Sequence, residues 1–153
     1  MSAFEIDLQV EATLLETTVE LLRTVADAAL REAEVTPPAS LSILLTDDEH
    51  VHQLNREYRG VDEPTDVLSF PTGEGMPGTG HYLGDIAIAV PVARAQAAAA
   101  GHGLDAELAL LTVHGILHLL GYDHDSTEKK AAMWVAQEEV LAGLGIEVRL
   151  PPE

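Results

Sequence analysis

The chain contains no cysteine and little positive charge. Its 153 residues include 8 Lys and Arg against 26 Asp and Glu, so the formal net charge is −18. The absence of cysteine fits a reducing compartment and excludes thiolate ligands from any metal site. The scarcity of basic groups means that bulk electrostatics oppose binding to a polyanion, so a nucleic-acid function would need the few cations to gather at the site.

Long hydrophobic runs are also missing. The apolar run at residues 86–90 is stopped by Pro91 and Arg94, far short of the ~20 residues that span a bilayer. The N-terminus has neither the basic region nor the apolar stretch of a secretory signal. We therefore expect a cytoplasmic protein without a membrane partner. The length and the 46% hydrophobic content fit one domain over residues 1–153 with a buried core.

Hydrophobic periodicity predicts both strands and helices. Residues 4–10 alternate apolar and polar side chains, as a half-buried strand does, and residues 14–33 show helical spacing. Further strands are expected at residues 41–45, 66–70 and 83–89. Further helices are expected at residues 46–58, 90–100, 106–120 and 126–141. This order predicts an α+β domain in which a small four-stranded mixed sheet packs with five helices.

Several segments between these elements also allow predictions. Residues 71–80 hold four Gly and two Pro, which predicts a mobile surface loop. The helix at 106–120 is apolar on nearly every side, so we expect it to be central and buried. The expected helix starts are a capping box of Thr46 with Glu49, a cap at Asp105 and a cap at Asp125.

Residues 114–124 read His-Gly-Ile-Leu-His-Leu-Leu-Gly-Tyr-Asp-His and predict a metal site. His114 and His118 are one helical turn apart and share a face. Gly121 can leave the helix at positive φ and bring His124 back toward them. Three neutral imidazoles with an open fourth position are typical of a catalytic zinc site, with one Zn²⁺ per chain. Nickel, copper and iron also accept histidine ligands and remain open.

The pattern resembles that of one class of zinc proteases in its histidines and its glycine, but Gly115 replaces the Glu that acts there as the general base. The same metal geometry is therefore expected to act on a different substrate, with the base unassigned. Asp66 and Asp85 are candidates for orienting a ligand histidine, or are strand-end and turn residues. Asp123 allows the same two interpretations.

Other chemically notable side chains have simpler interpretations. Tyr122 is interpreted as core packing, with stacking on a base as the alternative. Four histidines without metal spacing are interpreted as surface residues: His50, His52, His81 and His102. Three apolar residues of the last helix are expected in the core: Met133, Trp134 and Val140.

Three segments together are similar to the YbeY-type bacterial rRNA maturation endoribonucleases. They are the histidine motif at 114–124, the stretch from Asn55-Arg-Glu-Tyr-Arg to Thr-Asp-Val-Leu-Ser-Phe-Pro at 55–71, and Leu-Gly-Asp-Ile at 83–86 with Gln-Ala at 96–97. The resemblance implies a zinc-dependent, single-strand-specific endoribonuclease that acts in 16S rRNA 3′-end maturation and ribosome quality control. It implies that His114, His118 and His124 hold zinc, and that Arg59 and His114 are catalytic.

The expected partner is the small ribosomal subunit and its rRNA, reached through a ribosomal protein or assembly factor because the chain is so acidic. Arg59 would clamp a phosphate, although a helix-end salt bridge is the alternative from sequence alone. The base would be zinc hydroxide, or the metal would activate a 2′-hydroxyl. A zinc peptidase or amidohydrolase, and a non-catalytic ribosome-assembly factor with structural zinc, remain open.

Overall fold

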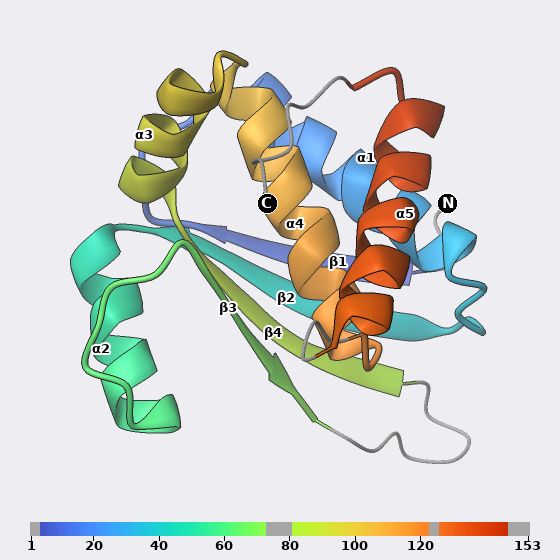
Figure 1. Ribbon diagram of the computed structural model, residues 1–153, viewed down its shortest axis with the longest axis horizontal. Helices are drawn as coiled ribbons and strands as arrows, with labels where there is room; N and C mark the ends of the chain where they lie inside the picture. The colour runs from blue at the N-terminus through green and yellow to red at the C-terminus, as the bar shows by residue number, and fades with distance from the viewer. Residues whose placement is uncertain (1–3, 73–80, 123–125, 147–153) are drawn as a thin grey trace.

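The computed structural model describes residues 4–72, 81–122 and 126–146. These residues form four strands and five helices in the predicted order, and the predicted α+β class is confirmed (Figure 1). The strands are β1 (Phe4–Val10), β2 (Ala39–Thr46), β3 (Val67–Pro71) and β4 (His81–Ala89). The helices are α1 (Glu16–Glu32), α2 (Asp48–Arg59), α3 (Val90–Ala100), α4 (Leu104–Leu119) and α5 (Thr127–Gly143). Most of the predicted loop at 71–80 lies outside the described residues.

The sheet is mixed, with the strand order β1-β2-β4-β3. β1, β2 and β4 are parallel neighbours, and β3 runs antiparallel to β4 at one edge. Pro71 closes β3 opposite Gly84, which is an edge position where a sheet tolerates proline. No helix formed by the described residues has both the length and the apolar composition needed to cross a bilayer.

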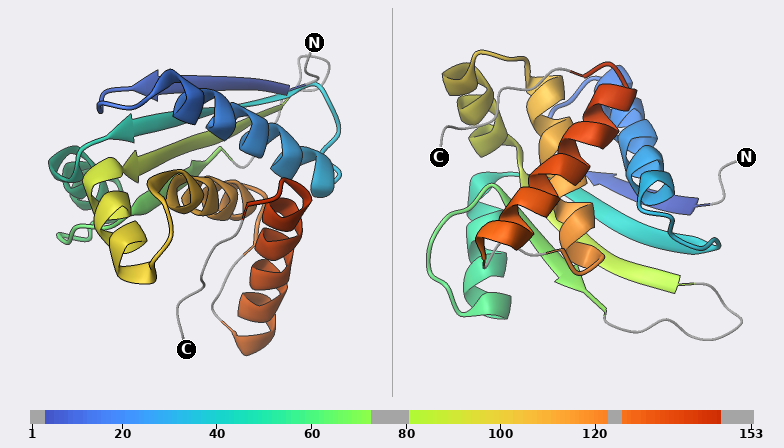
Figure 2. Two further views of the ribbon diagram at one scale, coloured as in Figure 1. Left: turned by 90° about the horizontal axis from the view of Figure 1, so that it is seen from above. Right: turned by 45° about the vertical axis from the view of Figure 1, so that its right-hand side comes forward.

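The two faces of the sheet are covered differently (Figures 1 and 2). Leu41, Ile43 and Leu45 of β2 point into the main core, where they pack with residues of α1, α4 and α5. The opposite face is covered in part by α2, which stands apart from these helices. A second, smaller cluster lies there, formed by Val51, Leu68, Ala87 and Ala89. The strands therefore separate α2 from α4.

Helix α4 is the centre of the fold. It contacts α1, α3, α5, β3 and β4, as its nearly continuous apolar surface predicts. Gly115 lets it approach the sheet closely, because a Cβ there would lie 2.9 Å from Cγ2 of Ile86 and 3.3 Å from Oγ of Ser69. The Ser69 hydroxyl also donates a hydrogen bond of 3.0 Å to the Gly115 carbonyl. Both contacts hold α4 against β3 and β4.

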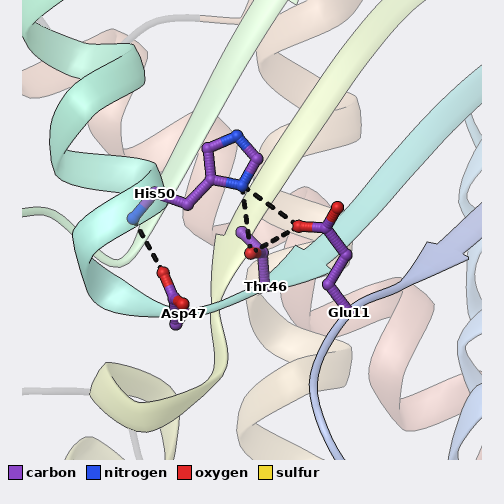
Figure 3. Close-up of polar contacts among 4 residues, drawn as sticks. All are labelled: Glu11, Thr46, Asp47 and His50. Carbon is purple, nitrogen blue, oxygen red and sulfur yellow. Dashed lines mark hydrogen bonds and ion pairs between the residues drawn. The ribbon is translucent and has the colours of Figure 1, made fainter.

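Helix α2 begins one residue later than predicted, at the cap Asp47 rather than Thr46. The Asp47 carboxylate accepts a 2.8 Å hydrogen bond from the N–H of His50 (Figure 3). Thr46 instead ends β2 opposite Ala89, and its hydroxyl donates to Oε1 of Glu11 at 2.8 Å. Both residues can cap a helix, and the sheet pairing of Thr46 decides between them.

The predicted caps of the last two helices also need correction. α4 is capped by Gly103 and not by Asp105, whose carboxylate accepts a 2.7 Å hydrogen bond from the Thr18 hydroxyl of α1. α5 is capped by Ser126, which accepts from the N–H of Lys129 at 3.1 Å. Asp125, the predicted cap, lies outside the described residues.

The close approach at Gly115 can be tested by adding a single methyl group. We expect Gly115→Ala to lower the free energy of unfolding by about 1–3 kcal/mol, since the buried Ile86 must shift, although Ala favours helices. The matched control is Gly143→Ala on α5, where an added Cβ meets nothing within 4 Å; it should be neutral or raise stability by up to ~1 kcal/mol. Urea unfolding of the metal-free proteins measures both changes. Equal stability of the two variants would contradict the packing argument.

Candidate metal centre

His114 and His118 are the two exceptions on an otherwise buried stretch of helix. Every residue of α4 from Glu107 to Leu119 is buried except these two, which are half-buried. Their rings meet edge to face, with centroids 4.7 Å apart and an interplanar angle of 75°. Their Nε2 atoms face each other at 3.2 Å. The predicted pairing of the two imidazoles on one helix face is therefore confirmed.

The spacing of these nitrogens fits a zinc ion. Two nitrogen ligands of tetrahedral zinc, each ~2.0–2.1 Å from the metal, lie about 3.3 Å apart. The 3.2 Å between the Nε2 atoms matches that separation, and imidazole nitrogen is a ligand that zinc prefers. The donor atoms and the distance between them are thus suitable for a metal ion.

Gln137 of α5 orients the first histidine. Its side-chain Oε1 lies 2.7 Å from Nδ1 of His114, and its side chain is only 1% exposed. An amide oxygen can only accept a hydrogen bond, so Nδ1 of His114 must carry the proton. In the neutral ring the lone pair is then on Nε2, the atom that faces His118. This is the tautomer that a ligand histidine needs when it binds a metal through Nε2.

Gln137 was not among the predicted site residues, although the sequence contains a signal for it. Residues 133, 137, 140 and 141 share one face of α5, and Met133, Val140 and Leu141 of that face are buried in the core. A polar residue inside an apolar stripe at helical spacing needs a buried hydrogen-bond partner. The pattern thus indicates a polar contact at position 137 but does not identify His114, because that contact is tertiary.

The contacts described for Asp66 and Asp85 are with residues other than His114 and His118, and His124 lies outside the described residues. The Asp66 carboxylate accepts from the N–H of Val67 at 2.8 Å, which is the strand-end alternative of the sequence analysis. Asp85 is exposed and accepts a hydrogen bond from the Tyr82 hydroxyl. Partial burial of the phenol, followed by the hydrogen bond to Asp85, raises the pKa of Tyr82. Alternation along β4 directs Asp85 away from α4, because its neighbour Ile86 faces the main core.

The turn after α4 follows the prediction for Gly121. This residue has φ +96°, its N–H bonds to the His118 carbonyl at 3.1 Å, and the N–H of Tyr122 bonds to the Leu117 carbonyl at 2.9 Å. The pair of bonds is a Schellman motif, which reverses the chain at the helix end. Tyr122 packs against the main core, as the first interpretation of this residue predicted.

The third predicted ligand, His124, lies outside the described residues, as does Asp123. Among the residues that the structure describes, no three histidine or carboxylate side chains gather as a metal site. The pair His114 and His118 is therefore placed by the structure, whereas the set of three histidines stays a prediction.

Gly115 explains why the zinc-protease Glu is absent. A side chain at this position would point at Ile86 and Ser69 of the sheet, where even a Cβ is too close. A Glu carboxylate there would be buried against the strands and kept away from the two Nε2 atoms. The chain thus combines a histidine pair with a helix face that excludes the protease base.

Arg59 is the last residue of α2 and is exposed. Within the described ranges it makes no ion pair, so the salt-bridge alternative finds no partner there. No described interaction links it to the histidines, from which the sheet separates α2. The C-terminal ends of α2 and α4 nevertheless lie toward the same side of the molecule in Figure 1. The buried Asn55 shapes this region, because its amide donates to the Glu63 carbonyl at 2.8 Å.

A groove of about 370 Å³ lies on the α2 face of the sheet. Its wall includes Tyr58 and Phe70, whose rings meet edge to face at 5.8 Å, together with Leu44, Leu54 and Asp85. The side chains of this wall belong to the face opposite α4. The groove is therefore distinct from the histidine pair.

Three of the histidines outside the motif, His50, His52 and His102, have structural partners. His50 shares its Nδ1 between Glu11 at 3.1 Å and the Thr46 hydroxyl at 3.2 Å (Figure 3). Both contacts use Nδ1 of His50, and Thr46 is buried, with 1% of its surface exposed. The cluster therefore lacks the accessible nucleophile and adjacent base that covalent catalysis needs. His102 was interpreted as a surface residue, which is wrong: its side chain is 8% exposed and lies 2.6 Å from the buried Glu107 carboxylate.

Comparisons with known proteins agree over most of the chain. Residues 5–145 match the family model described as Endoribonuclease YbeY. A protein named Endoribonuclease YbeY from Moorella thermoacetica is 48% identical over 139 residues, which cover 86% of this chain and 89% of the relative. The protein of that name from Desulforamulus reducens is 42% identical over 145 residues, covering 92% and 95%. A solution structure of a Thermotoga maritima protein has TM-score 0.59 and 26% identity, covering 92% of this chain and 91% of that one.

The pairing of His102 with Glu107 predicts unequal effects of two histidine substitutions. We expect His102→Ala to lower the free energy of unfolding by about 1–3 kcal/mol, because it removes a 2.6 Å hydrogen bond from the buried Glu107 carboxylate. The control is His52→Ala, which removes a 2.8 Å contact with the exposed Asp62 and should cost less than about 1 kcal/mol. Urea unfolding at neutral pH compares them, and similar small losses in both variants would contradict the buried pairing.

Proposed function

This chain belongs to the endoribonuclease YbeY family, and from this premise we propose that it cleaves single-stranded RNA with the help of a bound zinc ion. Its role would be the 3′-end maturation of 16S rRNA and ribosome quality control in the cytoplasm. The observation on which the proposal depends is the histidine pair of α4. The Nε2 atoms of His114 and His118 lie 3.2 Å apart, the separation expected of two zinc ligands, and the Gln137 contact places the His114 proton on Nδ1.

The metal would be held by His114, His118 and His124, with one position left for substrate or water. A zinc ion bound in this way supplies Lewis-acid chemistry, either by polarising a phosphoryl oxygen or by making hydroxide available near neutral pH. The two described ligands extend from a buried helix, so their positions are held by packing against β3, β4 and α5. Such rigidity keeps reacting groups within the small tolerance that catalysis requires.

Arg59 is proposed as the residue that binds the scissile phosphate. Its guanidinium can donate two parallel hydrogen bonds to phosphate oxygens, and no described residue occupies it in an ion pair. Arg56 and Arg59 both lie in the last turn of α2. They account for two of only eight basic side chains in the chain.

The partner is proposed to be the small ribosomal subunit, approached through a ribosomal protein or an assembly factor. With a net charge of −18, long-range electrostatics oppose free RNA rather than attract it. A protein partner would supply the attraction that the surface lacks and leave Arg59 to act at short range. The peptidase alternative is disfavoured because Gly115 leaves no room for the base that such enzymes use.

Zinc binding should depend on His118 and not on histidines outside the motif. We expect His118→Ala to lower zinc affinity by at least about 100-fold, more than the loss of an outer-shell partner causes. His52→Ala is the matched control, since His52 is equally a helical histidine but pairs with exposed Asp62. Competition titration against a chromogenic chelator measures both affinities. Unchanged zinc affinity in His118→Ala would remove the proposed site.

Arg59 should matter for cleavage while contributing little to stability. We expect Arg59→Met to reduce kcat/KM on single-stranded RNA by about 100-fold or more, as the loss of a charge-stabilising donor does. Its zinc content and unfolding midpoint should match the wild type, because Arg59 is exposed and has no ion pair within the described residues.

The control for this test is Arg56→Met, which removes the same charge from the same helical turn. It should retain activity within a few-fold. Equal losses in the two variants would mean that the general charge of the helix end matters and that Arg59 has no specific contact with the phosphate.

A further inference from the structure

Gln137 is a polar residue at a buried position of α5, and packing alone does not explain its presence there. Its neighbours on the inner face of α5, Met133, Val140 and Leu141, are apolar and buried. A buried amide is costly unless its polar atoms are hydrogen-bonded, so an apolar side chain of similar size would suit this position better. Its presence calls for a function that a methionine or leucine could not perform.

The contact with His114 supplies that function. Oε1 of the buried Gln137 lies 2.7 Å from Nδ1 of the half-buried His114. The two residues belong to different helices and are 23 positions apart in the chain. The bond both selects the protonated nitrogen and limits rotation of the ring. Helix α5 packs directly on α4, so the amide is held as firmly as the histidine.

We propose that Gln137 is a positioning residue of the metal centre, whose amide oxygen keeps His114 in the Nδ1-protonated tautomer with Nε2 directed at the metal. The inference rests on the proposed function, because the ion itself belongs to that proposal. It assigns a role to α5, a helix that contains none of the predicted ligands. The contact would also fix the His114 tautomer before any metal binds.

The neutral amide has a chemical consequence of its own. A carboxylate in this place would make the imidazole a stronger donor and would add negative charge next to the metal. The amide fixes the ring without that charge, so three neutral ligands would leave the full positive charge of the ion available to polarise a phosphate. Compared with a carboxylate, Gln at position 137 should therefore make the bound ion a stronger Lewis acid and its binding weaker.

The first readout is the tautomer of His114 in the metal-free protein, taken from long-range ¹H–¹⁵N correlations of the imidazole nitrogens. We expect the wild type to be protonated at Nδ1. In Gln137→Met, which keeps length and burial but lacks the acceptor, we expect a mixture of both tautomers. We also expect zinc affinity to fall about 10–100-fold, the range for lost outer-shell partners, and cleavage to recover when zinc is added in excess.

Two further variants separate positioning from structural support. Met133→Ala damages the same helix interface without touching His114, and should reduce stability but leave the tautomer and the zinc affinity unchanged. Gln137→Glu retains an acceptor at Oε1, and should keep the Nδ1 proton and bind zinc at least as tightly as the wild type. The Glu variant also provides a test if Gln137→Met does not fold.

The outcomes distinguish this inference from the function on which it rests. An unchanged tautomer and unchanged zinc affinity in Gln137→Met would overturn the positioning role, as would a Gln137→Glu variant that loses zinc. A wild-type protein that binds no zinc would overturn the proposed function, whereas a tautomer that depends on Gln137 in the metal-free protein would still support the orienting contact.

Discussion

The packing of α4 against β3 and β4 determines where the chemistry of this molecule can lie. Gly115 allows the helix to touch Ile86 and Ser69 at distances that no larger residue permits, and α1, α3 and α5 enclose the rest of its surface. From Glu107 to Leu119 only His114 and His118 keep partial access to solvent. The same contact thus buries the helix, aligns two imidazoles and excludes the carboxylate base found in the related protease pattern.

The acidity of the chain contrasts with the neutral groups found at the proposed metal site. At −18 the surface repels free polyanions, whereas the described part of the centre consists of two imidazoles and an amide, none of which is an anion at neutral pH. Within the described residues, Asp85 lies on the far face of the sheet and the Asp66 carboxylate bonds to the N–H of Val67, so neither is hydrogen-bonded to the histidine pair. A phosphodiester brought in by a protein partner would therefore meet little local repulsion at the histidine pair.

Much of the fold could be predicted because its elements depend on local patterns. The alternation in β1, the short apolar run in β2, the spacing in α1 and the continuous apolar surface of α4 can each be recognised in a single segment, as can the turn at Gly121. The helix caps were harder to predict, since Thr46 and Asp47 have similar local chemistry and only the pairing of Thr46 with β4 separates them. The burial of His102 and the contact of Gln137 with His114 depend on helices meeting in space, which no local pattern encodes. For the same reason the local sequence does not show that Asp66 bonds to the N–H of Val67 and Asp85 to the Tyr82 hydroxyl.

The most direct test of the account is a titration of zinc into the metal-free protein, with metal binding and cleavage of a single-stranded RNA followed in the same samples. The account predicts no cleavage without metal and a rate that rises in proportion to bound zinc, reaching its maximum at one ion per chain. Full cleavage by the metal-free protein, or one tightly bound ion with no cleavage, would contradict the claim that the histidine pair of α4 forms a catalytic metal centre.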